Sequence, residues 1–254
     1  MKETILEKLS SIEKDHDVKI LYACESGSRG WGFASQDSDY DVRFIYVHKK
    51  DCYLSLDQKR DVIEQPINYL LDINGWDIKK ALMLFYKSNP TLYEWLDSPI
   101  VYRDDHGFVD DLKKLIPDYF SAKACFHHYL SMLTNNYADY ANKEEIKLKK
   151  YFYVLRPLFA CHWLKEFNKM PPMEFQDLLS VSCLENDLRK AIDELLEIKI
   201  KSAEQDLQQR IPLIDQFVLQ GIEELTEFAK SVLSVQSRSL DKLNDIFRDV
   251  LNKA

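Results

Sequence analysis

The sequence predicts an α+β protein, with an N-terminal mixed sheet and flanking helices followed by a C-terminal helical bundle. Short runs of β-branched and aromatic residues, which favour strands, are concentrated in about the first hundred residues. Beyond them the apolar residues recur at helical spacing, and only one of the six glycines follows Gly107. We therefore expect an α/β domain over residues 1–104 and a helical domain over residues 105–254 that packs against it.

The α/β part is expected to begin with a helix and to contain three extended segments. The helix is expected over residues 3–14, and the extended segments over residues 18–24, 41–48 and 62–73. Pro66 lies within the third segment and favours a sheet edge, a bulge or a break there. Asp77 is placed to cap a helix that runs to about Lys87, because a side-chain oxygen before the first turn accepts from free backbone N–H groups.

The remainder of the chain shows almost no strand signal and reads as a series of helices. These helices are expected over residues 108–140, 143–169, 184–203, 207–233 and 240–251. Ser239 is placed to cap the last of them. The chain has no long polar linker, so we expect its two parts to pack closely.

Composition limits the classes of protein that the chain can represent. No apolar run approaches the roughly 20 residues that span a bilayer, and the N-terminus lacks a signal-peptide pattern. We therefore expect a cytoplasmic protein without a membrane partner. The five scattered cysteines form no C-x-x-C pair, which favours reduced thiols. A net charge of -8 argues against broad binding of nucleic acid but leaves room for a local basic patch.

The segment over residues 27–44, GSRGWGFASQDSDYDVRF, combines residue types that suit phosphate chemistry. Gly27, Gly30 and Gly32 allow the backbone to turn tightly and to approach a ligand closely. Backbone N–H groups in such a turn, together with the Ser28 hydroxyl, can bind phosphate oxygens. The turn is therefore a candidate phosphate-binding site.

Two carboxylates follow the turn at the start of the second predicted strand. Asp39 and Asp41 are two residues apart, a spacing that places both side chains on one face of a strand. Two carboxylates so close repel each other, and a divalent cation relieves that repulsion. Mg²⁺ prefers carboxylate oxygens together with substrate phosphates, so this pair is a candidate metal site.

The glycine–serine turn, followed after ten residues by Asp39-Tyr40-Asp41, resembles the signature of the DNA polymerase beta superfamily of nucleotidyltransferases. The phrases LDINGWDIKKAL, KSNPTLYEWLDSPIVYR and KKYFYVLRPLFACHWL further resemble predicted nucleotidyltransferases that some bacteria encode beside RNA-repair genes. The resemblance covers residues 24–172. It implies a nucleotidyltransferase-type sheet, an NTP substrate and Mg²⁺ or Mn²⁺ as the cofactor, with Asp39 and Asp41 as metal ligands.

The superfamily usually places a third carboxylate on a later strand, and two residues are candidates. Asp72 closes the third extended segment, where a strand residue could reach the metal ions. Asp77 is better explained as a helix cap. We therefore assign Asp72, as a metal ligand or as the base toward the acceptor. Arg43 shares the strand face of Asp41 and could form an ion pair that competes with the metal.

A second group of candidate binding residues lies in the helical part. Lys149, Tyr153 and Arg156 share one helix face and could hold a triphosphate or stack on a base. A solvated charged face beside a core seam explains the same pattern. Arg29 could contact phosphate, and we expect Trp31 to pack against the core.

The sequence therefore predicts transfer of a nucleoside monophosphate from an NTP to an acceptor hydroxyl, with release of pyrophosphate. RNA ends, protein side chains and small molecules remain possible acceptors, and the resemblance favours an RNA end. The alternative is a non-catalytic nucleotide-binding or regulatory module with the same fold. The oligomeric state is left open. The residues assigned to substrate binding are Gly27, Ser28, Arg29, Lys149, Tyr153 and Arg156.

Overall fold

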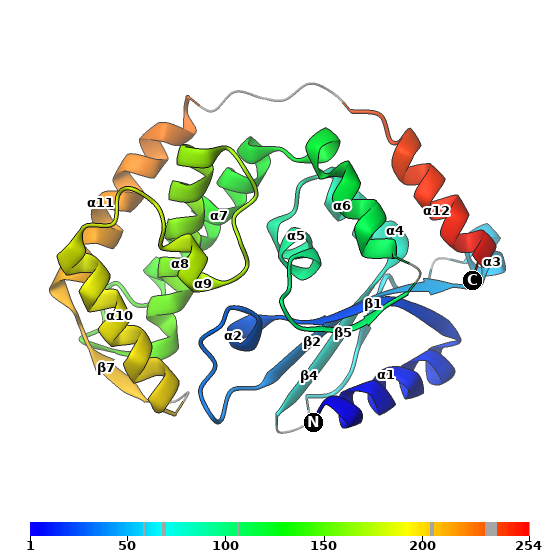
Figure 1. Ribbon diagram of the computed structural model, residues 1–254, viewed down its shortest axis with the longest axis horizontal. Helices are drawn as coiled ribbons and strands as arrows, with labels where there is room; N and C mark the ends of the chain where they lie inside the picture. The colour runs from blue at the N-terminus through cyan, green and yellow to red at the C-terminus, as the bar shows by residue number, and fades with distance from the viewer. Residues whose placement is uncertain (58, 68–69, 106, 204–205, 232–237, 254) are drawn as a thin grey trace. The chain divides into compact units, whose positions relative to one another are not determined.

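The computed structural model describes residues 1–254 except 58, 68–69, 106, 204–205, 232–237 and 254 (Figure 1). Contacts divide the chain into two compact units, each discontinuous in the sequence. The first unit comprises residues 1–27, 39–120 and 236–254, and the second comprises residues 28–38 and 121–235. The boundary expected at residue 104 stays a prediction, because contacts alone do not show which segments fold independently.

The first unit contains a mixed five-stranded sheet in the order β3-β4-β2-β1-β5. The strands are β1 (Val18–Glu25), β2 (Tyr40–His48), β3 (Val62–Glu64), β4 (Leu71–Asp77) and β5 (Val101–Asp104). β2 and β4 are parallel, and the other neighbouring pairs are antiparallel. The expected extended segment over residues 62–73 is thus divided into β3 and β4, with Pro66 in the interruption, because proline cannot donate to a strand ladder.

Helices cover both faces of this sheet (Figure 1). The helices of this unit are α1 (Lys2–His16), α3 (Lys50–Leu54), α4 (Ile78–Tyr86), α5 (Pro90–Leu96), α6 (Phe108–Tyr119) and α12 (Asp241–Lys253). The buried face of α1 packs with Val42, Phe44 and Tyr46, which alternate along β2. The intervening residues of β2 face the other side, where α4 lies against β2 and β4. The sheet is therefore buried on two sides, and its strand ends carry the polar groups.

The second unit is mainly helical. It contains α7 (Ala122–Ala138), β6 (Glu145–Lys147), α8 (Leu148–Phe167), α9 (Phe175–Leu178), α10 (Asn186–Lys201), β7 (Leu207–Gln209) and α11 (Pro212–Ala229). β6 and β7 form a two-stranded antiparallel sheet that the sequence did not predict, since three-residue strands show no usable periodicity. The helix expected over residues 108–140 is two helices, because Phe120 is extended and the Ser121 side chain caps α7.

The observed architecture confirms the expected α+β class, with a mixed sheet, flanking helices and a helical C-terminal part. No helix in the described part of the chain is both long enough and apolar enough to cross a bilayer.

Candidate active site

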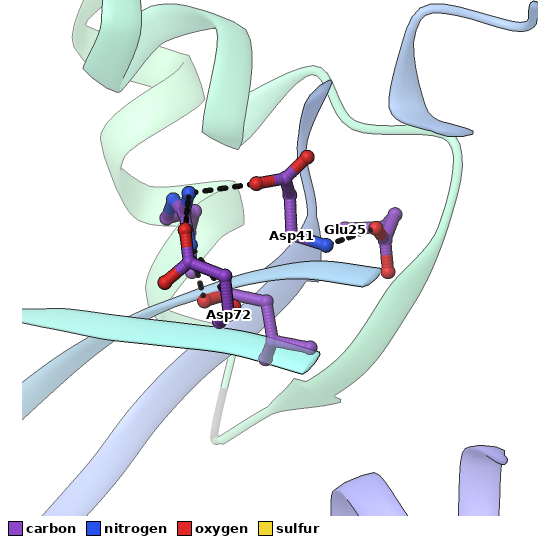
Figure 2. Close-up of polar contacts among 5 residues, drawn as sticks. Glu25, Asp41 and Asp72 are labelled. Atoms are coloured by element: carbon purple, nitrogen blue, oxygen red, sulfur yellow. Dashed lines mark hydrogen bonds and ion pairs between the residues drawn. The ribbon is translucent and has the colours of Figure 1, made fainter. Parts of the chain in front are cut away.

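Two of the predicted carboxylates lie side by side on the parallel strands β2 and β4. Asp41 is the register partner of Asp72, so the two side chains leave the sheet at neighbouring positions (Figure 2). The sequence predicts Asp72 at the end of an extended segment, but in the structure it lies at the start of β4. Asp39 immediately precedes β2, so strand alternation does not place its side chain. Parallel pairing thus brings together carboxylates that are 31 positions apart in the chain.

The Arg43 guanidinium joins these two carboxylates. Its Nη2 atom lies 2.9 Å from an oxygen of Asp41 and 2.8 Å from an oxygen of Asp72 (Figure 2). Its Nη1 atom donates to the backbone carbonyls of Val42 and Asp72, each at 3.1 Å. The ion pair expected between Arg43 and Asp41 is confirmed, and Asp72 shares it. The two carboxylates therefore converge on a single cationic group.

Gly27 leaves the space that the Asp41 carboxylate occupies. A Cβ atom at position 27 would lie 1.9 Å from the Asp41 Oδ2 atom, far inside van der Waals contact. The Gly27 backbone also has φ of 57°, which other residues adopt only with strain. The N–H group of Ser26 donates to the Asp41 carbonyl at 2.8 Å, so the turn after β1 is tied directly to β2. Glycine is required here for close approach as well as for its backbone conformation.

Glu25, the last residue of β1, is an acidic neighbour of this pair that sequence reasoning missed. Its side chain is fully buried, and its Oε1 accepts from the Asp41 N–H at 2.7 Å (Figure 2). Its Oε2 accepts a hydrogen bond from the Tyr102 hydroxyl on β5. A charged residue that ends an otherwise apolar strand, immediately before a glycine turn, was the available signal. Glu25 fixes the backbone of Asp41 rather than adding a free ligand.

Asp77, the competing candidate for the third carboxylate, has a structural role. Its Oδ1 accepts from the Lys79 N–H at 2.8 Å and so caps α4, as the sequence predicted. Its Oδ2 accepts from the Tyr53 hydroxyl at 2.6 Å. Burial raises the pKa of this carboxyl, and the two hydrogen bonds oppose that shift. Asp77 is the last residue of β4 and Asp72 is its second, so the two lie near opposite ends of the same strand.

The loop over residues 28–38, which carries Ser28, belongs to the second unit. The Arg29 guanidinium donates to the Ser38 carbonyl at 2.8 Å and so closes the loop on itself. The Ser38 hydroxyl is fully buried and accepts from the Ser35 N–H at 3.0 Å. The Lys199 ammonium from α10, which is only 1% exposed, donates to the Ser35 hydroxyl at 2.9 Å. Arg29 therefore shapes the loop in this structure.

The three predicted binding residues on α8 differ in exposure: Arg156 is buried, whereas Lys149 and Tyr153 reach solvent. Arg156 is 3% exposed, donates to the Met173 carbonyl at 3.2 Å and lies over the Trp31 ring at 4.7 Å. Tyr153 is 36% exposed and contacts the edge of Trp31. Lys149 is partly exposed. The expected packing of Trp31 is confirmed. The Arg156 guanidinium, one of the predicted ligand-binding groups, packs over the Trp31 ring.

The Asp41–Asp72 pair has the chemistry of a divalent-cation site. Both groups offer carboxylate oxygens, the ligands that Mg²⁺ prefers, and both already share the positive charge of Arg43. Among the residues that the structure describes, no three His, Cys, Asp or Glu side chains come together in a metal-binding arrangement. The pair therefore fits a cation that takes its remaining ligands from substrate or water, as Mg²⁺ usually does.

The first unit has a mixed sheet, a glycine turn after β1 and paired carboxylates on β2 and β4. These are the parts expected of a nucleotidyltransferase in the DNA polymerase beta superfamily. The chain matches the RNA repair pathway DNA polymerase beta family over residues 1–249, and it belongs to that family. The resemblance inferred from the sequence is thereby confirmed.

Two further comparisons identify a protein of similar sequence and a solved structure that the chain matches. It is 46% identical over 253 residues to a Bacillus subtilis (strain 168) protein named "Uncharacterized protein YcgL", covering 100% of this chain and 97% of that one. It also matches the crystal structure of a nucleotidyltransferase-like protein from Exiguobacterium sibiricum 255-15 at 12% identity, covering 98% of this chain and 80% of that one, with a TM-score of 0.29.

Proposed function

We propose that the protein transfers a nucleoside monophosphate from an NTP to an acceptor hydroxyl and releases pyrophosphate. The observation that supports this most directly is the placement of Asp41 and Asp72 in register on parallel strands. Both carboxylates bind the same positive group, the Arg43 guanidinium. Membership of an RNA repair family favours an RNA end as the acceptor. Gly27, one of the predicted phosphate-binding residues, lies two residues beyond β1, and the intervening Ser26 N–H donates to the Asp41 carbonyl.

In the proposed reaction the acceptor oxygen forms a bond to the α-phosphorus of the NTP. The bond from that phosphorus to the oxygen bridging toward the β-phosphate breaks, and pyrophosphate leaves with the electron pair. The proton of the acceptor hydroxyl passes to a carboxylate of the pair, for which Asp72 is our choice, and from there to water. Asp41 is held in place for this task by Glu25 and Gly27.

A divalent cation, Mg²⁺ or Mn²⁺, would be held by Asp41 and Asp72, with Asp39 as the further carboxylate assigned from the sequence. When bound, it would lower the charge on the leaving pyrophosphate and favour the ionised acceptor. Arg43 occupies the position between the two carboxylates, so the cation must compete with a guanidinium for both.

The same Arg43 bridge also supports a second candidate function, a nucleotide-binding module without catalysis. A permanent guanidinium between the carboxylates would neutralise them and leave no position for a metal ion. The two functions differ in one measurable respect, because only the catalytic protein moves the α-phosphate of an NTP onto another molecule.

The test is to incubate the protein with Mg²⁺ or Mn²⁺ and each α-³²P-labelled NTP, with and without mixed RNA. We expect label on RNA, and we expect its loss in Asp41→Asn and Asp72→Asn, which keep the size of the side chain and remove its charge. Asp51→Asn is the matched control, because it changes an exposed carboxylate on α3 of the same unit.

Label transfer that survives the Asp41→Asn, Asp72→Asn double variant would refute the assignment of the site. Binding of NTP without transfer to RNA or protein would favour the non-catalytic function or a small-molecule acceptor. A set of small hydroxyl acceptors, tested with the same labelled NTP, separates these two.

A further inference from the structure

A polar pocket lies at the other end of the two strands that carry Asp41 and Asp72. Its cavity has a volume of about 530 Å³. His48 closes β2 and Asp77 closes β4, and both line the pocket. His48 is seven positions beyond Asp41 along β2, a span of about 23 Å at roughly 3.3 Å per residue. The pocket is thus distinct from the carboxylate site but belongs to the same unit and the same strand pair.

The lining of this pocket is predominantly cationic, although the chain as a whole carries a net charge of -8. Its five cationic residues outnumber its three acidic residues. The cationic residues are Lys59, Arg60, Lys79, Lys80 and Lys87, and the acidic ones are Asp57, Asp61 and Asp77. We call this site the lysine pocket. Burial lowers the pKa of the His48 imidazole, so this side chain adds no charge near neutral pH.

Two of the three acidic residues are already bound to groups of the protein. Asp77 accepts from the Tyr53 hydroxyl and from the backbone at the start of α4. Asp61 forms an ion pair of 3.1 Å with Lys80. The Asp61–Lys80 pair removes one charge of each sign, and Arg60 is paired with Glu64. The pocket's excess positive charge therefore comes from Lys59, Lys79 and Lys87.

Two lysines on the wall formed by α4 remain available for a ligand. Lys79 and Lys87 are exposed, and neither forms an ion pair with any residue that the structure describes. They flank Met83 on one face of the helix, because residues four apart lie above one another. Eight residues at about 1.5 Å rise place these two lysines about 12 Å apart along the axis. Such a row of ammonium groups suits a ligand with repeated negative charges.

We propose that the lysine pocket binds the phosphodiester backbone of an RNA strand whose end reaches the Asp41–Asp72 carboxylates. This inference rests on the proposed function, since it assumes an RNA acceptor. A free nucleotide offers its charges at one point, whereas the row along α4 and the distance to the carboxylates suit a continuous strand.

The test measures binding of a short fluorescein-labelled single-stranded RNA by anisotropy, without NTP or metal, so that it does not depend on catalysis. The variant is Lys79→Gln, Lys87→Gln, and the matched control is Lys2→Gln, Lys8→Gln on α1, which removes the same charge from exposed positions of the same unit. Circular dichroism confirms that each variant is folded. Titrations at about 50 and 200 mM salt give the salt dependence of the affinity.

We expect the α4 variant to bind RNA more weakly and the α1 variant to bind as the unchanged protein does. Loss of two phosphate contacts should lower the slope of log K against log salt by about 1.4, because each contact to a single strand contributes about 0.7. The gap between the unchanged protein and the α4 variant should then shrink about sevenfold between those two salt concentrations.

Equal affinities and slopes for the two double variants would overturn the proposal. Displacement of the RNA by micromolar inorganic phosphate would also overturn it, since the pocket would then belong to a free phosphate compound. A protein that binds RNA through these lysines but transfers no nucleotide would leave the pocket assigned and refute only the proposed reaction.

Discussion

Replacing Arg43 with Met tests how the carboxylate site is held when no metal is bound. The substitution keeps the unbranched apolar stem of the side chain and removes the guanidinium that Asp41 and Asp72 share. If Arg43 competes with the divalent cation for these groups, its removal should strengthen metal binding. The same change should weaken the fold in the absence of metal, because two neighbouring carboxylates then repel each other.

The size of the effect follows from the geometry. Opposite charges about 4 Å apart attract by about 4 kcal/mol at an effective dielectric constant of about 20, before desolvation and side-chain ordering are subtracted. The three side chains are 18%, 26% and 30% exposed, so solvent screens each pair, and a net value of about 1 kcal/mol per pair is reasonable. Two pairs give about 2 kcal/mol, which corresponds to an approximately 30-fold lower Kd for the metal.

The assay is a titration with Mn²⁺ followed by electron paramagnetic resonance of the free ion, which requires no turnover. Arg103→Met is the matched control, because Arg103 on β5 forms a similarly half-buried ion pair with Glu13 in the same unit. We expect both variants to lose stability without metal, but only Arg43→Met to bind Mn²⁺ more tightly. At a fixed Mn²⁺ concentration, the melting temperature of Arg43→Met should rise more than that of Arg103→Met, which keeps the competing guanidinium.

An unchanged or weaker Mn²⁺ affinity in Arg43→Met would refute this reasoning. It would mean that the guanidinium holds the carboxylates in place without blocking the cation. Arg43→Lys refines the result, since a lysine keeps the charge but lacks the planar fork that reaches two acceptors at once. We expect its Mn²⁺ affinity to lie between those of the unchanged protein and Arg43→Met.

Three further predictions concern the neighbours of this site and the second unit. Gly27→Ala should lower the transfer rate by about 10²-fold, because its Cβ would displace the Asp41 carboxylate by more than 1 Å, and single-turnover kinetics would measure the loss. Glu25→Ala should lower the free energy of unfolding by about 1–3 kcal/mol in urea titrations, since it leaves the partly buried Asp41 N–H and the Tyr102 hydroxyl without their acceptor, whereas Glu25→Gln should cost less. Burial lowers the pKa of His162 in the fold, so the unfolded chain binds a proton first as the pH falls below about 6.5. Stability is therefore lost toward acid, and the melting temperature of His162→Gln should fall less between about pH 7.5 and 5.5; an equal fall in both proteins would contradict this assignment.

Local sequence determined the features of this protein that depend on neighbouring residues. The glycine turn, the strand that follows it and the capping role of Asp77 were all predictable, because each depends on backbone conformation or on groups within a few positions. The division between β3 and β4 was signalled by Pro66, which cannot donate to a strand ladder. The missed elements, such as β6 and β7, are too short to show a period.

Tertiary structure decided which side chains meet. The pairing of Asp41 with Asp72 depends on β2 and β4 being adjacent and parallel in one register, and a shift of one residue would turn Asp72 to the other face. The role of Glu25 requires β1 beside β2, and the burial of Arg156 requires the Trp31 loop against α8. Sequence spacing specifies which face of its own element a side chain occupies, but contacts between distant segments arise only when the core packs. For that reason the candidate residues could be named from the sequence, while the Arg43 bridge to Asp72 could be found only in the folded chain.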